Sequence, residues 1–174
     1  MNAYASALAE AMAMLSLDPK TIFLGQTVVY PGTAMHRTLA NVPVNQKLEF
    51  PVAEETQMGA SIGLALSGLL PVSIFTRWNF MLLATNQLVN HLDKIPLYSG
   101  YRPKVIIRTG VGSEYPMYPG PQHTGDYTDT FSRMCKTVKF VRLDSADMIM
   151  PAYWEALRSE FSTVLVEISD LYND

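Results

Sequence analysis

Short apolar runs rich in β-branched residues alternate with longer helical segments along the whole chain. Strands are predicted at residues 21–24, 48–52, 72–75, 104–108, 137–142 and 163–168. Helices are predicted at residues 3–16, 54–67, 79–94, 127–134 and 145–159. Strands that alternate with helices form a parallel sheet covered on both faces. We therefore expect an α/β fold with three layers, in which a mainly parallel sheet of about six strands lies between helices.

Length and composition limit the classes of protein that the chain can represent. With 174 residues and no repeat or linker, we expect a single domain over residues 1–174. The net charge of −3 argues against a nucleic-acid partner or a membrane surface. No segment approaches the roughly 20 apolar residues that span a bilayer. Cys135 is the sole cysteine, so a reducing, cytoplasmic setting is expected and Cys135 is interpreted as a half-buried thiol.

Polar and aromatic residues cluster directly after the predicted strands. Ligand sites of parallel sheets gather at the carboxyl ends of the strands. Glu54 follows the apolar triplet at residues 50–52. It either stabilises the first turn of a helix or, shielded from water, shares a proton with a ligand. Glu55 is a second carboxylate beside it, so the sequence leaves open which of the two faces a ligand.

Three further segments are candidates for the same site. Trp78 and Phe80 either belong to the core or form a wall for a flat ring. His123 follows a loop at residues 109–122 that is dense in glycine and proline, and it is either solvated or held for function. Gln26 follows Gly25, where the chain either turns or approaches a ligand closely. The histidines lack the spacing of a metal site, so no metal ligands are predicted.

These segments, in this order, resemble the pyrimidine-binding domain of the transketolase-like thiamine-diphosphate enzymes. They are most similar to the N-terminal domain of the beta subunit of 2-oxoacid dehydrogenases. The resemblance is carried by Phe-Pro-Val-Ala-Glu at 50–54, Gly-Leu-Leu-Pro-Val at 68–72, Asn-Phe at 79–80, Ile-Arg-Thr at 107–109, Gln-His at 122–123 and residues 167–172.

The resemblance implies a cofactor and a set of residue roles. Thiamine diphosphate is the implied cofactor, and the glutamate at Glu54 bonds its pyrimidine ring and promotes formation of the reactive ylide. The aromatic residue at Phe80 packs against that ring, and the histidine at His123 faces the reacting centre. The other implied cofactor contacts are Val52, Gln26 and Trp78.

The chain also departs from the family. It has no Gly-Asp-Gly followed by Asn, the motif that holds magnesium and the diphosphate in that family, and we expect no C-terminal domain of the kind that follows there. We therefore expect a separate diphosphate-binding chain that holds the magnesium, in an α2β2 assembly, and a 2-oxoacid or ketone substrate. Transfer of a two-carbon unit, as in transketolase, and a non-catalytic interaction or regulatory domain are the alternatives. The apolar helix at 79–94 is expected to be buried within the domain or against that partner.

Overall fold

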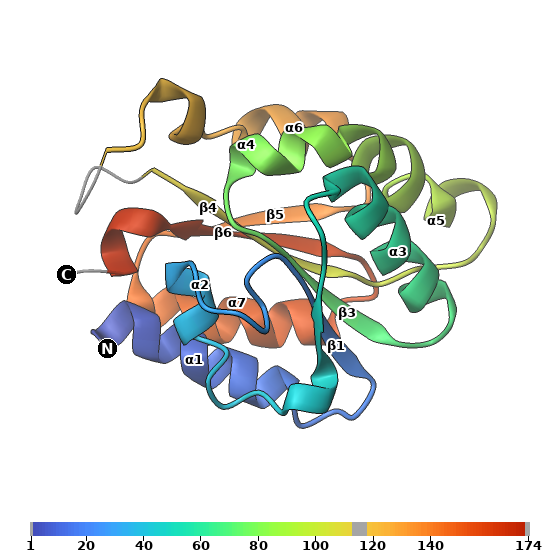
Figure 1. Cartoon of the computed structure of the whole chain (residues 1–174). Coiled ribbons are helices and arrows are strands. Elements are labelled where there is room, and N and C mark those ends of the chain that lie inside the picture. The colour runs from blue at the N-terminus through green and yellow to red at the C-terminus, as the bar shows by residue number, and fades with distance from the viewer. Residues whose placement is uncertain (1, 113–117, 173–174) are drawn as a thin grey trace.

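Six parallel strands form one sheet in the computed structural model, which describes residues 2–112 and 118–172 (Figure 1). Their spatial order is β2-β1-β3-β4-β6-β5. The strands are β1 (Thr21–Gly25), β2 (Lys47–Glu49), β3 (Leu70–Phe75), β4 (Ile106–Val111), β5 (Lys139–Leu143) and β6 (Thr163–Ile168). The central strands β3 and β4 are buried along their whole length, as expected of parallel strands covered on both faces.

Helices cover both faces of the sheet, as the sequence predicts (Figure 1). They are α1 (Ala3–Leu15), α2 (Ala34–Arg37), α3 (Glu54–Leu66), α4 (Trp78–Met81), α5 (Ile95–Tyr98), α6 (Thr128–Met134) and α7 (Ala146–Arg158). Leu8 and Tyr153 represent the core between the sheet and the α1–α7 layer. Met58 and Trp78 represent the core between the sheet and α3, α4 and α6. No helix in the described part of the chain is long and apolar enough to cross a membrane.

The carboxyl ends of the central strands lie level with one another. Gly25 at the end of β1 pairs with Ile74, and Phe75 at the end of β3 pairs with Thr109 in β4. The segments that follow β1, β3, β4 and β6 therefore emerge at one edge of the sheet. This edge is where the sequence places the candidate site.

The helix predicted at 79–94 is present from Trp78 to Leu92, but it changes type along its length and is not one regular α-helix. After α4 the chain forms a 3₁₀ turn at Leu82–Ala84 and a π-helix at Gln87–Leu92. The Asp93 N–H donates to the Leu88 carbonyl at 3.0 Å, which is the i→i+5 bond of a π-helix. Pro96 does not end a helix at this point but lies in the first turn of α5, where its missing N–H is tolerated.

Two predicted boundaries also move. The loop predicted from residue 109 starts later, because Thr109 and Gly110 pair with β6 and the strand continues through Val111. Residues 113–117 of that loop, with Pro116, lie outside the described residues. The strand predicted at 48–52 is β2, which ends at Glu49. The connection predicted at 27–46 contains α2. Thr33 caps the N-terminus of α2, because its side chain accepts the His36 N–H.

Candidate active site

Glu54 is a shielded carboxylate at the carboxyl edge of the sheet. It is the first residue of α3 and is 6% exposed, whereas Glu55 beside it is exposed. Gln26, from the segment after β1, donates from Nε2 to Glu54 Oε1 at 3.4 Å. This bond is long, so the carboxylate keeps most of its capacity to bond a ligand. Of the two glutamates that the sequence offers, Glu54 is the one withdrawn from water.

Glu49 holds the segment that carries Gln26. Its carboxylate accepts the backbone N–H groups of Thr27 at 2.6 Å, Val28 at 2.9 Å and Val29 at 2.7 Å. Thr27 has a φ of 56°, a left-handed conformation that β-branched residues rarely adopt. The three charge-assisted hydrogen bonds stabilise this strained turn, and the turn in turn positions Gln26 beside Glu54.

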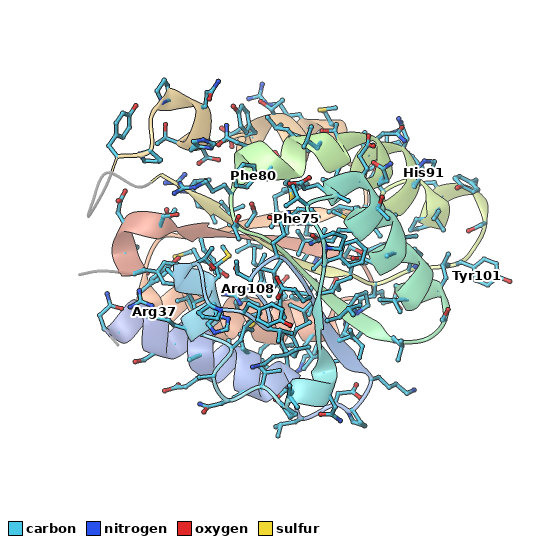
Figure 2. All side chains as sticks on the ribbon, viewed as in Figure 1. Arg37, Phe75, Phe80, His91, Tyr101 and Arg108 are labelled. Carbon is cyan, nitrogen blue, oxygen red and sulfur yellow. The ribbon has the colours of Figure 1, made fainter. Side chains whose placement is uncertain are left out.

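Phe80 and His123 contact each other at the same edge of the sheet. Phe80 lies in α4 (Figure 2), His123 ends a 3₁₀ turn at Pro121–His123, and their ring centroids are 5.5 Å apart. Arg77 joins the two segments, because its Nη1 donates to the carbonyls of His123 and Gly112 at 3.1 Å each. The Nδ1 atom of His123 is buried without a hydrogen-bond partner among the described residues. Buried polar atoms usually have a hydrogen-bond partner, so this ring nitrogen is a candidate to bond a ligand.

The remaining predicted contacts differ in their access to a ligand. Val52 is 79% exposed and lies at the rim of the site. Trp78 has no exposed surface; it packs on Phe131 with ring centroids 4.9 Å apart and donates from Nε1 to Thr128 at 3.3 Å. Its ring therefore has no surface to offer a ligand in this conformation, and it belongs to the core behind Phe80. Leu83, 60% exposed, lines a cavity of about 180 Å³ together with Glu54.

The structure thus brings together two pairs of predicted residues, Gln26 with Glu54 and Phe80 with His123. Glu49 and Arg77 were not predicted, because both act on backbone groups that only the fold brings within reach. Leu83 was predicted as part of a helix buried within the domain or against a partner, and it is 60% exposed in this chain. Within residues 2–112 and 118–172, no three His, Cys, Asp or Glu side chains are placed to hold a metal ion.

The side chains of this site fit one heteroaromatic ring better than a whole dinucleotide-sized cofactor. A shielded carboxylate can bond a ring nitrogen, and the half-buried Phe80 offers an aromatic face. The cavity beside Glu54, at about 180 Å³, is smaller than the several hundred Å³ that enclose a typical ligand. Ala53, Glu54, Glu55, Thr56 and Leu83 line it, and none of these side chains is cationic. The rest of such a ligand has to be held elsewhere.

This combination defines a parallel α/β domain with a shielded carboxylate and an aromatic face at its carboxyl edge. The chain belongs to the family "Transketolase, pyrimidine binding domain", which matches residues 1–173. The fold comparison agrees: a solved structure titled "Split gene transketolase, inactive beta4 tetramer" superposes with a TM-score of 0.75 at 16% identity, over 94% of this chain and 50% of that one.

Curated relatives point to one branch of this family. The pyruvate dehydrogenase E1 component subunit beta of Staurastrum punctulatum is 27% identical over 90% of this chain and 48% of its own length. The chloroplastic subunit beta-4 of the same component from Oryza sativa subsp. japonica is 29% identical, over 90% of this chain and 40% of its own length. The chain therefore spans about half the length, or less, of these relatives.

Proposed function

We propose that the chain is the pyrimidine-domain part of a thiamine-diphosphate-dependent enzyme that cleaves or decarboxylates a 2-oxoacid. The observation that carries this proposal is the 6% exposure of Glu54, a carboxylate at the start of α3 whose bond to Gln26 is only 3.4 Å long. Membership in the pyrimidine-binding family and similarity to pyruvate dehydrogenase beta subunits support it. When bound, thiamine diphosphate supplies the carbon nucleophile that attacks the ketone or 2-oxoacid.

The residues of this chain bind and orient that cofactor and move a proton. Glu54 bonds the pyrimidine ring nitrogen and shares a proton with it, and Gln26 holds the carboxylate in place. Phe80 packs against the ring, and Val52 contacts it from the rim. His123, whose Nδ1 has no hydrogen-bond partner in the described part of the chain, faces the reacting centre and bonds the substrate carboxylate. Trp78 packs in the core against Phe131.

A partner chain holds the diphosphate and its magnesium in this proposal. The cavity at Glu54 has room for a ring and no cationic side chain for a phosphate. The relatives' names identify them as beta subunits of a component, which supports a heteromeric assembly, proposed as α2β2. The two cores on the faces of one sheet support treating residues 1–174 as a single domain.

The test is cofactor-dependent turnover of the chain co-expressed with candidate diphosphate-binding partners. Glu54→Gln is expected to reduce turnover by about 100-fold or more, in the range that a proton-transfer residue contributes. Glu55→Gln tests the neighbouring carboxylate, and Glu10→Gln is the matched control, because Glu10 is exposed on α1, outside this cavity, and should leave turnover within about twofold. Thiamine diphosphate binding is measured in parallel by calorimetry.

The outcomes separate the proposal from its alternatives. Full activity of Glu54→Gln, or damage from Glu55→Gln instead, contradicts the role of Glu54. Turnover of ketoses with an aldehyde acceptor, but not of 2-oxoacids, assigns the chain to two-carbon transfer. Failure of every complex to bind thiamine diphosphate leaves the non-catalytic alternative.

A further inference from the structure

Arg77 contacts both members of the Phe80–His123 pair, one through its backbone and the other through its side chain. Its carbonyl accepts the Phe80 N–H at 3.1 Å and so begins α4. Its side-chain Nη1 donates to the His123 carbonyl at 3.1 Å. The position of Phe80 therefore depends on the backbone of Arg77, whereas the position of His123 depends on the guanidinium. A substitution of the side chain is expected to displace His123 and leave Phe80 in place.

The backbone of His123 is bonded on both sides. Its N–H donates to the Gly120 carbonyl at 3.0 Å within the 3₁₀ turn, and its carbonyl accepts from Arg77. With both groups bonded, the direction of the ring is left to the side-chain torsions alone. The same Nη1 atom donates to the carbonyl of Gly112, directly after β4, at 3.1 Å. Arg77 thus links the turn that carries His123 to the end of a central strand.

A second hydrogen bond from α4 holds the chain beyond His123. Asn79 donates from Nδ2 to the Tyr127 hydroxyl at 3.3 Å. Gly125 leaves room for the Tyr127 ring, because a Cβ at Gly125 would lie 2.6 Å from the Tyr127 hydroxyl oxygen. This contact does not involve Arg77. Without the guanidinium, the segment should therefore stay folded while His123 itself loses its fixed orientation.

The charge of Arg77 already has partners within the chain. Burial lowers the pKa of Arg77, the Asp170 carboxylate raises it, and an arginine stays protonated under both influences. Asp170 lies beside Gly112, because a Cβ at Gly112 would be 3.2 Å from Asp170 Oδ2. Two carbonyls and a nearby carboxylate thus interact with the guanidinium. These partners favour a role inside the protein over the capture of an anionic ligand.

A direct contact between Arg77 and a ligand is the alternative that an experiment has to separate. Arg77 and Phe80 also line a larger cavity of about 430 Å³, between the segments that follow β1, β3 and β6. If Arg77 contacted a ligand there, its effect would be independent of His123. If it acts through His123, the effects of substituting the two residues are coupled and do not add.

We propose that Arg77 is a positioning residue: it holds the His123 turn against the end of β4 and so directs the His123 ring toward the reacting centre. It does this through two backbone carbonyls and without contact to the substrate. This inference rests on the proposed function for the chemistry at His123. The placement of the ring, however, is measurable without turnover.

The first experiment observes the His123 ring by NMR in the full chain, with any chain that accompanies it in purification. Carbon-13 at Cε1 gives one signal for each of the three histidines, and His123→Gln assigns the signal of His123. The ring current of Phe80, whose centroid is 5.5 Å away, shifts that signal. Arg77→Met should move it toward its position in Phe80→Leu, and the signals of the other two histidines should stay unchanged.

Two further variants make this result specific. Arg133→Met is the matched control, because Arg133 is an exposed arginine of α6, and it should move no histidine signal. Arg77→Lys guards against a folding defect, because it keeps a cationic donor on a shorter side chain, and it should give a smaller shift than Arg77→Met. Thermal unfolding checks each variant. An unchanged His123 signal in both Arg77 variants overturns the inference.

Turnover then separates positioning from direct contact with the substrate. In the co-expressed complex, Arg77→Met should lower kcat/KM for pyruvate about 10- to 100-fold, mainly by raising KM, because a displaced His123 loses its bond to the substrate carboxylate. The affinity for thiamine diphosphate should stay within about twofold, because Glu54 and Phe80 keep their positions. The double variant of Arg77→Met with His123→Ala should be no less active than His123→Ala alone. Losses that multiply in the double variant overturn the inference in favour of direct contact.

Failure of the inference is distinguishable from failure of the proposed function. If a complex binds thiamine diphosphate and turns over a 2-oxoacid while Arg77→Met leaves the His123 signal in place, the inference is wrong and the proposed function stands. If the His123 signal moves in Arg77→Met while no complex binds thiamine diphosphate, Arg77 positions the ring and the proposed function is wrong.

Discussion

At the scale of single residues, a buried ion pair joins the two strands that end beside the larger cavity. Arg108 in β4 donates from Nε to Glu167 Oε1 at 2.6 Å and from Nη2 to Oε2 at 3.1 Å, and both side chains have no exposed surface. The Tyr153 hydroxyl donates to the same carboxylate at 3.0 Å, and Arg108 also bonds Thr38 after α2 at 3.1 Å. The pair thus links the sheet to α7 and α2.

Removing one member of this pair leaves a buried charge without its partner. We expect Glu167→Gln to lower the free energy of unfolding by about 3–5 kcal/mol. The control is Asp144→Asn, which breaks the exposed ion pair with Arg142 and should cost less than about 1 kcal/mol. Urea denaturation of both variants measures the difference. Equal losses would show that burial does not set the energy of the Arg108–Glu167 pair.

Cys135 is a buried thiol, and burial suppresses its reactivity. Burial, reinforced by the Asp93 carboxylate, raises the pKa of Cys135 to about 12. At pH 8 the native thiol is then almost entirely protonated, so iodoacetamide should react far more slowly than with the chain in urea. Because the folded-state pKa lies above the unfolded value, the stability from Cys135 is complete below about pH 8.5 and declines as the pH rises toward 12. Equal alkylation rates for the native and unfolded chain would contradict this.

Sequence reasoning found the chemical groups of the site but not the groups that position them. Glu54 and His123 stand out because their neighbours are strand ends, glycines and prolines, which are local features. Glu49 and Arg77 bond backbone groups 20 to 46 residues away in the sequence. No local pattern marks such partners, because only the parallel crossover brings them into reach.

At the scale of elements, the helix predicted at 79–94 ends as a π-helix that is followed directly by Asp93. The Asp93 Oδ1 atom accepts the N–H groups of Lys136 at 2.8 Å, Thr137 at 2.6 Å and Val138 at 3.0 Å, in the segment just before β5. The wide turn of the π-helix allows Asp93 to face this strand. Apolar periodicity predicts that the segment is helical. It does not predict the π-helix, whose neighbour Asp93 has contacts more than 40 positions away. The helices α1, α3 and α7 match their predictions within two residues.

Asp93 links the π-helix to the segment before β5 by hydrogen bonds, and we expect this link to weaken in acid. Burial favours the protonated form, but Lys94 and the three backbone N–H groups outweigh it and lower the pKa of Asp93 to about 2. A lowered folded-state pKa means that its contribution to stability is complete above about pH 4 and is lost as the pH falls toward 2. Asp93→Asn should cost about 2 kcal/mol at pH 7 and should flatten the loss of stability in acid. A variant with unchanged acid dependence would contradict this role.

At the scale of the whole molecule, strand and helix alternation predicts the class of fold and the edge that carries the site. It does not predict the strand order, in which β6 lies between β4 and β5. That order brings the turn after β6 next to the ends of β1, β3 and β4, and so creates the larger cavity that Ser169 and Tyr172 line. The sequence does not indicate this cavity, because its lining residues come from three segments with no shared motif.

Exposed apolar residues beside Glu54 mark the surface on which we expect the diphosphate-binding partner to dock. Val52 is 79% exposed and Leu83 is 60% exposed, and Leu83 lines the same cavity as Glu54. A cofactor divided between two chains requires that the partner cover this cavity, so these side chains should become buried on assembly.

A charge introduced at this surface should therefore prevent assembly without disturbing the fold. We expect Leu83→Glu and Val52→Asp each to weaken binding of the co-expressed partner by at least about tenfold, because a buried, unpaired charge opposes docking. Leu17→Glu is the matched control: Leu17 is 83% exposed but precedes β1, at the opposite edge of the sheet. Light scattering after size-exclusion chromatography measures the complex, and thermal unfolding checks each variant. If Leu17→Glu dissociates the complex while the other two variants preserve it, the partner docks at the amino edge, and Glu54 cannot be the residue that meets a cofactor shared with it.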